Sequence, residues 1–166
     1  LMGTPIALKM LEAGYRVKVW GRSEEKLRPA LERGAVAATS ARAVAEASDV
    51  VFLCVTDTNA VEAVVFGADG IAQGGGVGKV LVDHSSIKPE ATRSFATRLR
   101  ELCDMSWIDA PVSGGPAGVE RGTLVVMAGG DETSHAKVRD IVSTYAARFT
   151  LMGPTGAVSY THLRAH

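Results

Sequence analysis

The sequence predicts an α/β fold in which a mostly parallel sheet is wound on both faces by helices. Strand-like apolar runs alternate with amphipathic segments of about 10–15 residues, the pattern of β–α–β units. The run 49–55 is apolar almost throughout, as expected of a parallel strand covered on both faces, and 79–84 is predicted to be another buried strand. Glycines end several helical segments, as Gly14 does after residues 4–13.

The elements of the first half can be justified in order. After the helix over 4–13, residues 15–20 alternate as a strand does. Residues 23–34 begin with acids and end at a glycine, which predicts a helix with a kink or break at Pro29. A short helix is expected over 40–48, and the glycine-rich run 72–78 is expected to be a loop.

The second half repeats the scheme, with Pro89 at a position that the first turn of a helix tolerates. Ser40, Asp57 and Asp131 each precede a helical run and are predicted N-caps. The remaining expected elements are a helix from Pro89, a strand at 105–109, a short segment at 116–121, a strand at 123–130, a helix to about Tyr145 and a strand at 148–152.

Composition excludes several classes of protein. The chain has 166 residues, 46% of them hydrophobic and 22% charged, with zero formal net charge, so nothing favours nucleic acid or an anionic membrane surface as a partner. No apolar run reaches the roughly 18 residues that span a bilayer. Cys54 and Cys103 lack metal-type spacing, so no metal site is expected and both should be reduced, as in a cytoplasmic protein.

Five loops are predicted to meet at one edge of the sheet. In doubly wound sheets, ligands bind outside the carboxyl ends of the strands. The loops at this edge are Met2-Gly3, 21–23, 55–57, 84–86 and 111–115. A dinucleotide would lie along this edge.

The segment Asp-Ala-Pro-Val-Ser-Gly-Gly, 109–115, follows an apolar strand and ends in two adjacent glycines. Glycine pairs weaken regular structure, so they indicate either a sharp turn or a close approach to the backbone N–H groups. A strand-to-helix turn is the simpler interpretation.

Four segments in order resemble the β-hydroxyacid dehydrogenase family, whose N-terminal domain is similar to that of 6-phosphogluconate dehydrogenase. They are Leu1-Met2-Gly3, like the end of a Gly-x-Gly-x-Met-Gly fingerprint, VDHSSIKPEAT, DAPVSGG and GTLVVMAGG. The resemblance covers about residues 1–157. It implies an NAD(P)-binding domain of Rossmann type and hydride transfer between the cofactor and a small 3-hydroxy acid or semialdehyde.

The resemblance assigns cofactor contacts to specific positions. Gly3 would allow close packing of helix against sheet and open a helix N-terminus toward the pyrophosphate. Asn59 has a first-turn helix residue as its alternative interpretation, and Ser86 has a helix cap as its alternative. The implied cofactor-binding residues at these loops are Met2, Gly3, Cys54, Val55, Asn59 and Ser86.

The same resemblance assigns the substrate's carboxylate and hydroxyl to Ser113, Gly114 and Gly115. Two glycines there would let backbone N–H groups reach an anion.

The loop at 21–23 bears on the type of cofactor. An acid at the end of the second strand would bind a ribose 2′-hydroxyl and repel a 2′-phosphate. The chain has Arg22 and Ser23 there instead, and both can donate to a phosphate. NADP is therefore favoured over NAD, the alternative being that Arg22 stacks on adenine or faces solvent.

Both ends depart from the family pattern. The family's first strand and first two glycines would precede Leu1, and that strand is central in the sheet. Losing about five buried apolar residues would remove on the order of 10 kcal/mol of burial. Residues 158–166 match no part of the pattern, so the catalytic lysine and the C-terminal helical domain are absent from this sequence. Whether residues 1–157 fold alone stays open.

No residue is therefore nominated as catalytic, and this chain is expected to be an inactive fragment of an enzyme whose full-length form is a homo-oligomer. The main alternative is a non-catalytic NADP-binding or partner-recruiting module. Imine reductases share the cofactor half but should depart at DAPVSGG. The four histidines, His84, His135, His162 and His166, form no recognisable site.

Overall fold

The computed structural model describes residues 2–157, and the tail at 158–166 lies outside the described residues. Its main sheet has six strands, and a separate sheet has two. The main strands are β3 (Val50–Leu53), β4 (Val80–Asp83), β5 (Ser106–Asp109), β6 (Val112–Ser113), β7 (Leu124–Gly129) and β8 (Ala146–Gly153). The separate strands are β1 (Lys18–Val19) and β2 (Val36–Ala37).

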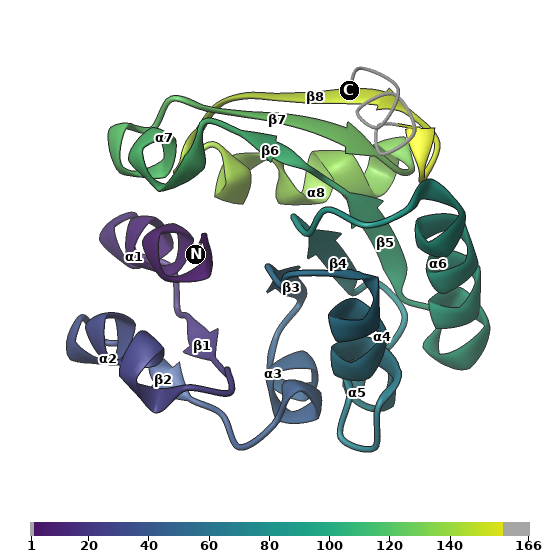
Figure 1. Cartoon of the computed structure of the whole chain (residues 1–166), viewed down its shortest axis with the longest axis horizontal. Helices are drawn as coiled ribbons and strands as arrows, with labels where there is room; N and C mark the ends of the chain where they lie inside the picture. Colours follow the sequence, from purple (N-terminus) through teal and green to yellow (C-terminus); the bar gives the residue numbers. More distant parts are fainter. Residues whose placement is uncertain (1, 158–166) are drawn as a thin grey trace.

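The sheet is mostly parallel, as the sequence predicts. Strands β3, β4 and β5 are parallel neighbours, as are β7 and β8, and β1 pairs in parallel with β2. Only β7 runs antiparallel to its neighbours β5 and β6. The fold is an α/β Rossmann-type domain with helices on both sides of the sheet (Figure 1).

Helices surround this sheet, and three of them begin at the predicted N-caps. The side chains of Ser40, Asp57 and Asp131 each accept a hydrogen bond from the backbone three residues on. The helices are α1 (Gly3–Glu12), α2 (Glu24–Glu32), α3 (Ala41–Ala47), α4 (Thr58–Phe66), α5 (Ile71–Gly74), α6 (Pro89–Cys103), α7 (Gly115–Arg121) and α8 (Glu132–Val142).

Alternate residues of β4 face two different cores, which shows that the sheet is wound on both faces. Val80 and Val82 pack with α1, α7 and α8 on one face, whereas Leu81 packs with α3, α4, α5 and α6 on the other. A small third cluster joins α1, α2 and β1 around Ala7 and Ala30.

Three local predictions are wrong. The run at 72–78 contains the end of α5, because Gly74 lets this short helix approach α3: a Cβ there would lie 2.3 Å from Arg42 O. Helix α2 continues through Pro29, which is exposed, so the break expected at this residue does not occur. The second strand is confined to Lys18–Val19, and its partner β2 was not expected.

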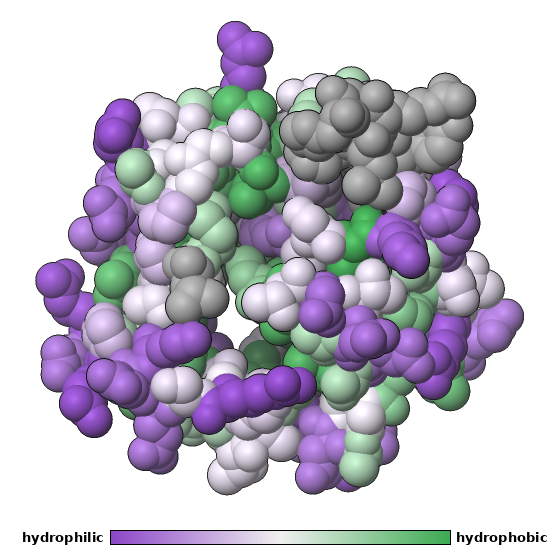
Figure 2. Space-filling model, viewed as in Figure 1, coloured by the Kyte–Doolittle hydropathy of each residue, from purple (hydrophilic) through white to green (hydrophobic). Residues whose placement is uncertain are grey.

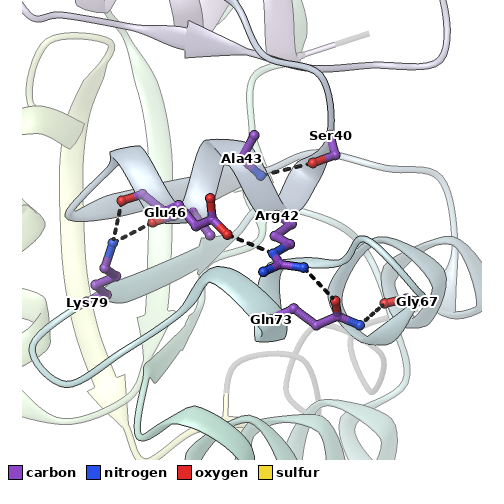
Figure 3. Close-up of polar contacts among 8 residues, drawn as sticks. Ser40, Arg42, Ala43, Glu46, Gly67, Gln73 and Lys79 are labelled. Atoms are coloured by element: carbon purple, nitrogen blue, oxygen red, sulfur yellow. Dashed lines mark hydrogen bonds and ion pairs between the residues drawn. The ribbon is translucent and has the colours of Figure 1, made fainter.

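At the edge of the sheet opposite the carboxyl ends of the strands, a cluster of polar side chains joins α3, α5 and the start of β4 (Figure 3). The Lys79 ammonium donates to Ala45 O at 2.5 Å and to Ser48 O at 2.9 Å, at the C-terminal end of α3, where a cation interacts favourably with the helix dipole. The Arg42 guanidinium bonds the Glu46 carboxylate at 2.7 Å and reaches Gln73 on α5. These contacts fix α3, α5 and the start of β4 relative to one another.

The sheet is interrupted between β3 and β1. Bonds from β4 reach the carbonyls of Asp49 and Leu53, so the backbone groups of Val50 and Phe52, which alternate with them, point away from β4. Likewise Val36 and Ala38 of the second sheet bond to Val17 and Val19, which leaves the backbone of Lys18 facing away from β2.

These two unpaired edges lie on either side of an open region. Figure 1 shows β1 and β3 with no strand between them, and Figure 2 shows an opening through the molecule there, bordered in part by apolar residues. Val17, Phe52 and Cys54 are partly buried apolar residues at these edges. Among residues 2–157, no strand joins the sheet of β1 and β2 to the main sheet. No helix among residues 2–157 is long and apolar enough to cross a membrane.

Candidate functional site

The carboxyl ends of β3, β4 and β5 lie in register and define the candidate site. Leu53, Asp83 and Asp109 are register partners across the three strands. The residues that follow are tied together by backbone bonds, His84 N–H to Leu53 O and Ala110 N–H to Asp83 O, both 2.8 Å. The loops after these strands therefore leave the sheet at one level.

Helix α1 begins beside this edge. Met2 occupies its N-cap and makes no side-chain capping bond, so it leaves the first-turn N–H groups of Gly3 and Thr4 available to a ligand. A Cβ on Gly3 would meet Cys54 Cβ at 3.9 Å, which is ordinary contact. Packing of helix against sheet therefore does not by itself require glycine here. The free N–H groups of Gly3 and Thr4, at the start of α1 and beside the strand ends, fit the pyrophosphate of a dinucleotide.

Cys54 and Val55 follow β3. The Val55 N–H donates to the Ser85 hydroxyl at 2.9 Å, which joins the loops after β3 and β4. Burial, with a smaller effect from Asp83, raises the pKa of the Cys54 thiol to about 12. The thiol therefore stays protonated near neutral pH, and Cys54 contributes apolar packing rather than a nucleophile.

Ser86 is exposed at the same edge. The N-cap of α6 is Lys88, so the alternative interpretation of Ser86 as that helix's cap is wrong. Asn59 is exposed in the first turn of α4, where Asp57 is the cap, so its interpretation as a first-turn helix residue is confirmed. A cofactor contact by Asn59 stays a prediction.

The glycine pair at 114–115 is explained by its backbone conformation. Gly114 has φ +130° and Gly115 φ +62°, in the region that favours glycine. They connect β6 to α7, so the interpretation as a strand-to-helix turn is confirmed. Ser113 is exposed at this turn. An anion-binding role for these N–H groups stays a prediction.

Arg22 and Ser23 follow β1, which belongs to the separate two-stranded sheet. The Arg22 side chain is exposed, and among residues 2–157 it has no hydrogen-bond or ion-pair partner. Ser23 is the N-cap of α2 but makes no side-chain capping bond. Both groups are therefore free to meet a ligand. Helix α2 is fixed to α1 by the Thr4 hydroxyl, which donates to Lys26 O at 2.8 Å.

A group of buried polar side chains beneath the site was not predicted from the sequence. His84 contacts Tyr145, and the buried Asp83 is the neighbour of His84 in the chain. Burial raises the pKa of Asp83 to about 7, against bonds from Ser85 that lower it, and burial lowers the pKa of His84 to about 4. Nothing in a single sequence indicates the contact between His84 and Tyr145. Among the described residues no group of three potential metal ligands occurs.

The comparisons with known proteins identify the class. The sequence profile described as the NAD binding domain of 6-phosphogluconate dehydrogenase matches residues 1–153. The chain therefore belongs to this family of NAD(P)-binding domains. Its homologues are members of the 3-hydroxyisobutyrate dehydrogenase and 2-hydroxy-3-oxopropionate reductase family.

Among the curated proteins, 2-hydroxy-3-oxopropionate reductase of Escherichia coli K12 is 41% identical over 158 residues, which cover 94% of this chain and 53% of that protein. The 3-hydroxyisobutyrate dehydrogenase of Salmonella typhimurium has a structure with a TM-score of 0.90 at 28% identity, covering 99% of this chain and 57% of that one. The structure of Psf3 in complex with NADP+ and 2-OPP matches with a TM-score of 0.92 at 27% sequence identity, and the match covers 99% of this chain and 58% of that one. The chain thus spans a little over half the length of these relatives.

Proposed function

We propose that this chain is the NADP(H)-binding half of an oxidoreductase that transfers hydride between NADP(H) and a small 3-hydroxy acid or the matching semialdehyde. The observation that carries the proposal is the meeting of three features at one sheet edge. These are the uncapped start of α1, the loops after β3 and β4, and the turn at 113–115, which leads into helix α7 packed against α1.

Each feature has a chemical task in this proposal. The N–H groups of Gly3 and Thr4 bind the pyrophosphate, and Arg22 with Ser23 binds the 2′-phosphate. Ser86 would contact the nicotinamide end of the cofactor, which supplies or accepts the hydride when bound. Ser113 and the N–H groups of the glycine turn hold the substrate's carboxylate and hydroxyl.

The proton of the substrate hydroxyl needs a general acid/base, and residues 2–157 offer no candidate at this edge. The Lys137 ammonium donates to Gly78 O before β4, at the opposite edge of the sheet. Lys88 is an exposed residue at the N-cap of α6. We therefore expect these 166 residues alone to turn over no hydroxy acid.

Substituting Arg22→Asp tests the cofactor preference. Loss of charge-assisted bonds and the new repulsion should weaken NADPH binding on the order of 10- to 100-fold, while NADH binding stays equal or improves. Fluorescence titration of reduced nicotinamide measures both. Arg28→Asp, the same charge change at an exposed position of α2, is the matched control and should affect both cofactors little. Equal losses for NADPH and NADH in Arg22→Asp would show that Arg22 does not read the 2′-phosphate.

A chimera tests the reaction itself. Residues 3–153 would replace the corresponding part of the E. coli 2-hydroxy-3-oxopropionate reductase, which supplies the flanking sequence on both sides. We expect NADPH-dependent reduction of its substrate and a fall in kcat/KM with Ser113→Ala. A chimera that folds and binds NADPH but reduces neither that substrate nor other small semialdehydes would instead favour the non-catalytic binding module.

A further inference from the structure

We propose that His84 is a positioning residue: as the neutral tautomer with its proton on Nδ1, it holds segment 110–115 in place relative to the ends of β3 and β4. The inference rests on the proposed function, because that segment is the proposed substrate-binding part of the site.

The two ring nitrogens of His84 have different partners. Nδ1 lies 2.6 Å from Ala110 O, and Nε2 lies 2.7 Å from the Tyr145 hydroxyl. A carbonyl oxygen can only accept, so Nδ1 carries the proton and donates it. Nε2 is then bare and accepts from the Tyr145 hydroxyl. Both side chains are buried, at 5% and 0% exposure, so water does not compete for these bonds.

Ala110 is held on both sides of its backbone. Its N–H donates to Asp83 O at 2.8 Å, and its carbonyl accepts from the His84 ring. Ser113 follows only three residues later along the chain. The position of the proposed substrate-binding turn is therefore set by two consecutive residues at the end of β4.

The same end of β4 also holds the neighbouring cofactor loop. The Ser85 hydroxyl accepts from Val55 N–H at 2.9 Å, and Ser85 N–H donates to the Asp83 carboxylate at 2.9 Å. Asp83, His84 and Ser85 thus connect the loop after β3 with the segment after β5. These loops carry the two halves of the proposed site.

Tyr145 anchors the histidine from outside the parallel strands. It lies between α8 and β8 and packs edge-on against the His84 ring, at 5.8 Å between ring centroids and 90° between planes. Phe52 of β3 stacks on the His84 ring at 6.1 Å between centroids and also contacts the Tyr145 ring edge-on, at 6.4 Å. An apolar side chain could fill this space, but only a group that donates at one position and accepts at another satisfies both Ala110 O and Tyr145.

Two substitutions separate the two bonds. In His84→Asn the amide N–H group can take the place of Nδ1 and donate to Ala110, whereas in His84→Gln the amide oxygen reaches toward Tyr145 and the bond to Ala110 is lost. Tyr145→Phe removes only the hydroxyl. Two measurements are made on the 166-residue chain without any ligand. The ring ¹⁵N spectrum of His84 shows which nitrogen carries the proton, and backbone ¹H–¹⁵N spectra with hydrogen exchange report on segment 110–115.

We expect one protonated and one bare ring nitrogen in the wild type, with the proton on Nδ1. In His84→Gln we expect displaced signals at residues 110–115 and about tenfold faster hydrogen exchange at the Ala110 amide. In His84→Asn we expect nearly wild-type signals for the same residues. A proton on Nε2 would overturn the proposal even if every variant failed to fold. Equal effects of Asn and Gln would overturn the positioning role and leave only packing.

These measurements use no cofactor, so a failure of the proposed function stays distinguishable. A chain that binds no NADPH but shows the Nδ1 proton and the Asn–Gln difference would contradict the function and not the positioning of the segment. In the chimera, the positioning role predicts that His84→Gln raises KM for substrate or lowers kcat about tenfold, while KM for NADPH stays within about twofold.

Discussion

A strand-forming extension joined directly before Leu1 is expected to raise the Tm of this chain by at least about 5 °C, since 1 kcal/mol corresponds to roughly 2–4 °C in a domain of this size. The extension would have five β-branched apolar residues followed by Gly-Leu-Gly. It would run parallel between β1 and β3 and pair with the backbone groups of Lys18, Val50 and Phe52. Burying its side chains contributes on the order of 10 kcal/mol before the cost of ordering the new residues.

The control is an extension of equal length with prolines at two of the five strand positions. Proline has no N–H group for the ladder, so this version should leave the Tm close to that of the original chain. Thermal unfolding followed by circular dichroism compares the three proteins. If both extensions raised the Tm equally, the gain would come from nonspecific apolar contact, and the interrupted sheet would not be a strand-binding position.

The pH dependence of stability should show two opposing contributions from adjacent residues. The pKa of Asp83 is raised from 3.8 to about 7, so the folded state holds its proton more tightly. The raised pKa adds roughly 4 kcal/mol to the free energy of unfolding at low pH. This contribution is lost as the pH rises from about 4 to 7. The pKa of His84 is lowered from 6.5 to about 4, so its contribution is present above pH 6.5 and lost as pH falls to 4, roughly 3 kcal/mol.

Between pH 4 and 6.5 these two slopes oppose each other, and their sum is nearly flat. Asp83→Asn should leave a free energy of unfolding that rises with pH by about 3 kcal/mol over this window. His84→Gln should leave one that falls by a similar amount, and the double variant should be flat again. Urea titrations at half-unit pH steps measure these profiles. Parallel profiles for all four proteins would mean that neither group titrates as its burial requires.

Local chemistry explains which parts of the fold the sequence predicts. Ser40, Asp57 and Asp131 are correct N-caps because the capping bond joins residues only three apart. The consecutive apolar residues of β4 likewise indicate a strand covered on both faces. Helix α5 was missed because Gly74 is there to let α3 approach, and a glycine required by a distant contact looks the same in sequence as one in a loop.

The candidate site divides in the same way. The resemblance assigns Gly3, Ser86 and Ser113 through motifs, and the register of β3, β4 and β5 accounts for the meeting of the loops after these strands. The contact between His84 and Tyr145 was not predicted, because the two residues are 61 positions apart and no motif assigns a role to either. Its existence depends on how α8 and β8 return to the end of β4.

The most direct test of the central claim is a map of where NADP+ touches the chain, obtained from backbone ¹H–¹⁵N spectra during titration of the strand-extended protein. We predict that the signals displaced first belong to Gly3, Thr4, Arg22, Ser23, Val55 and Ser86, with smaller changes for NAD+ at Arg22 and Ser23. Displacements confined to the opposite edge, around Lys79 and α3, or none at saturating NADP+, would contradict the assignment of this sheet edge as a dinucleotide site.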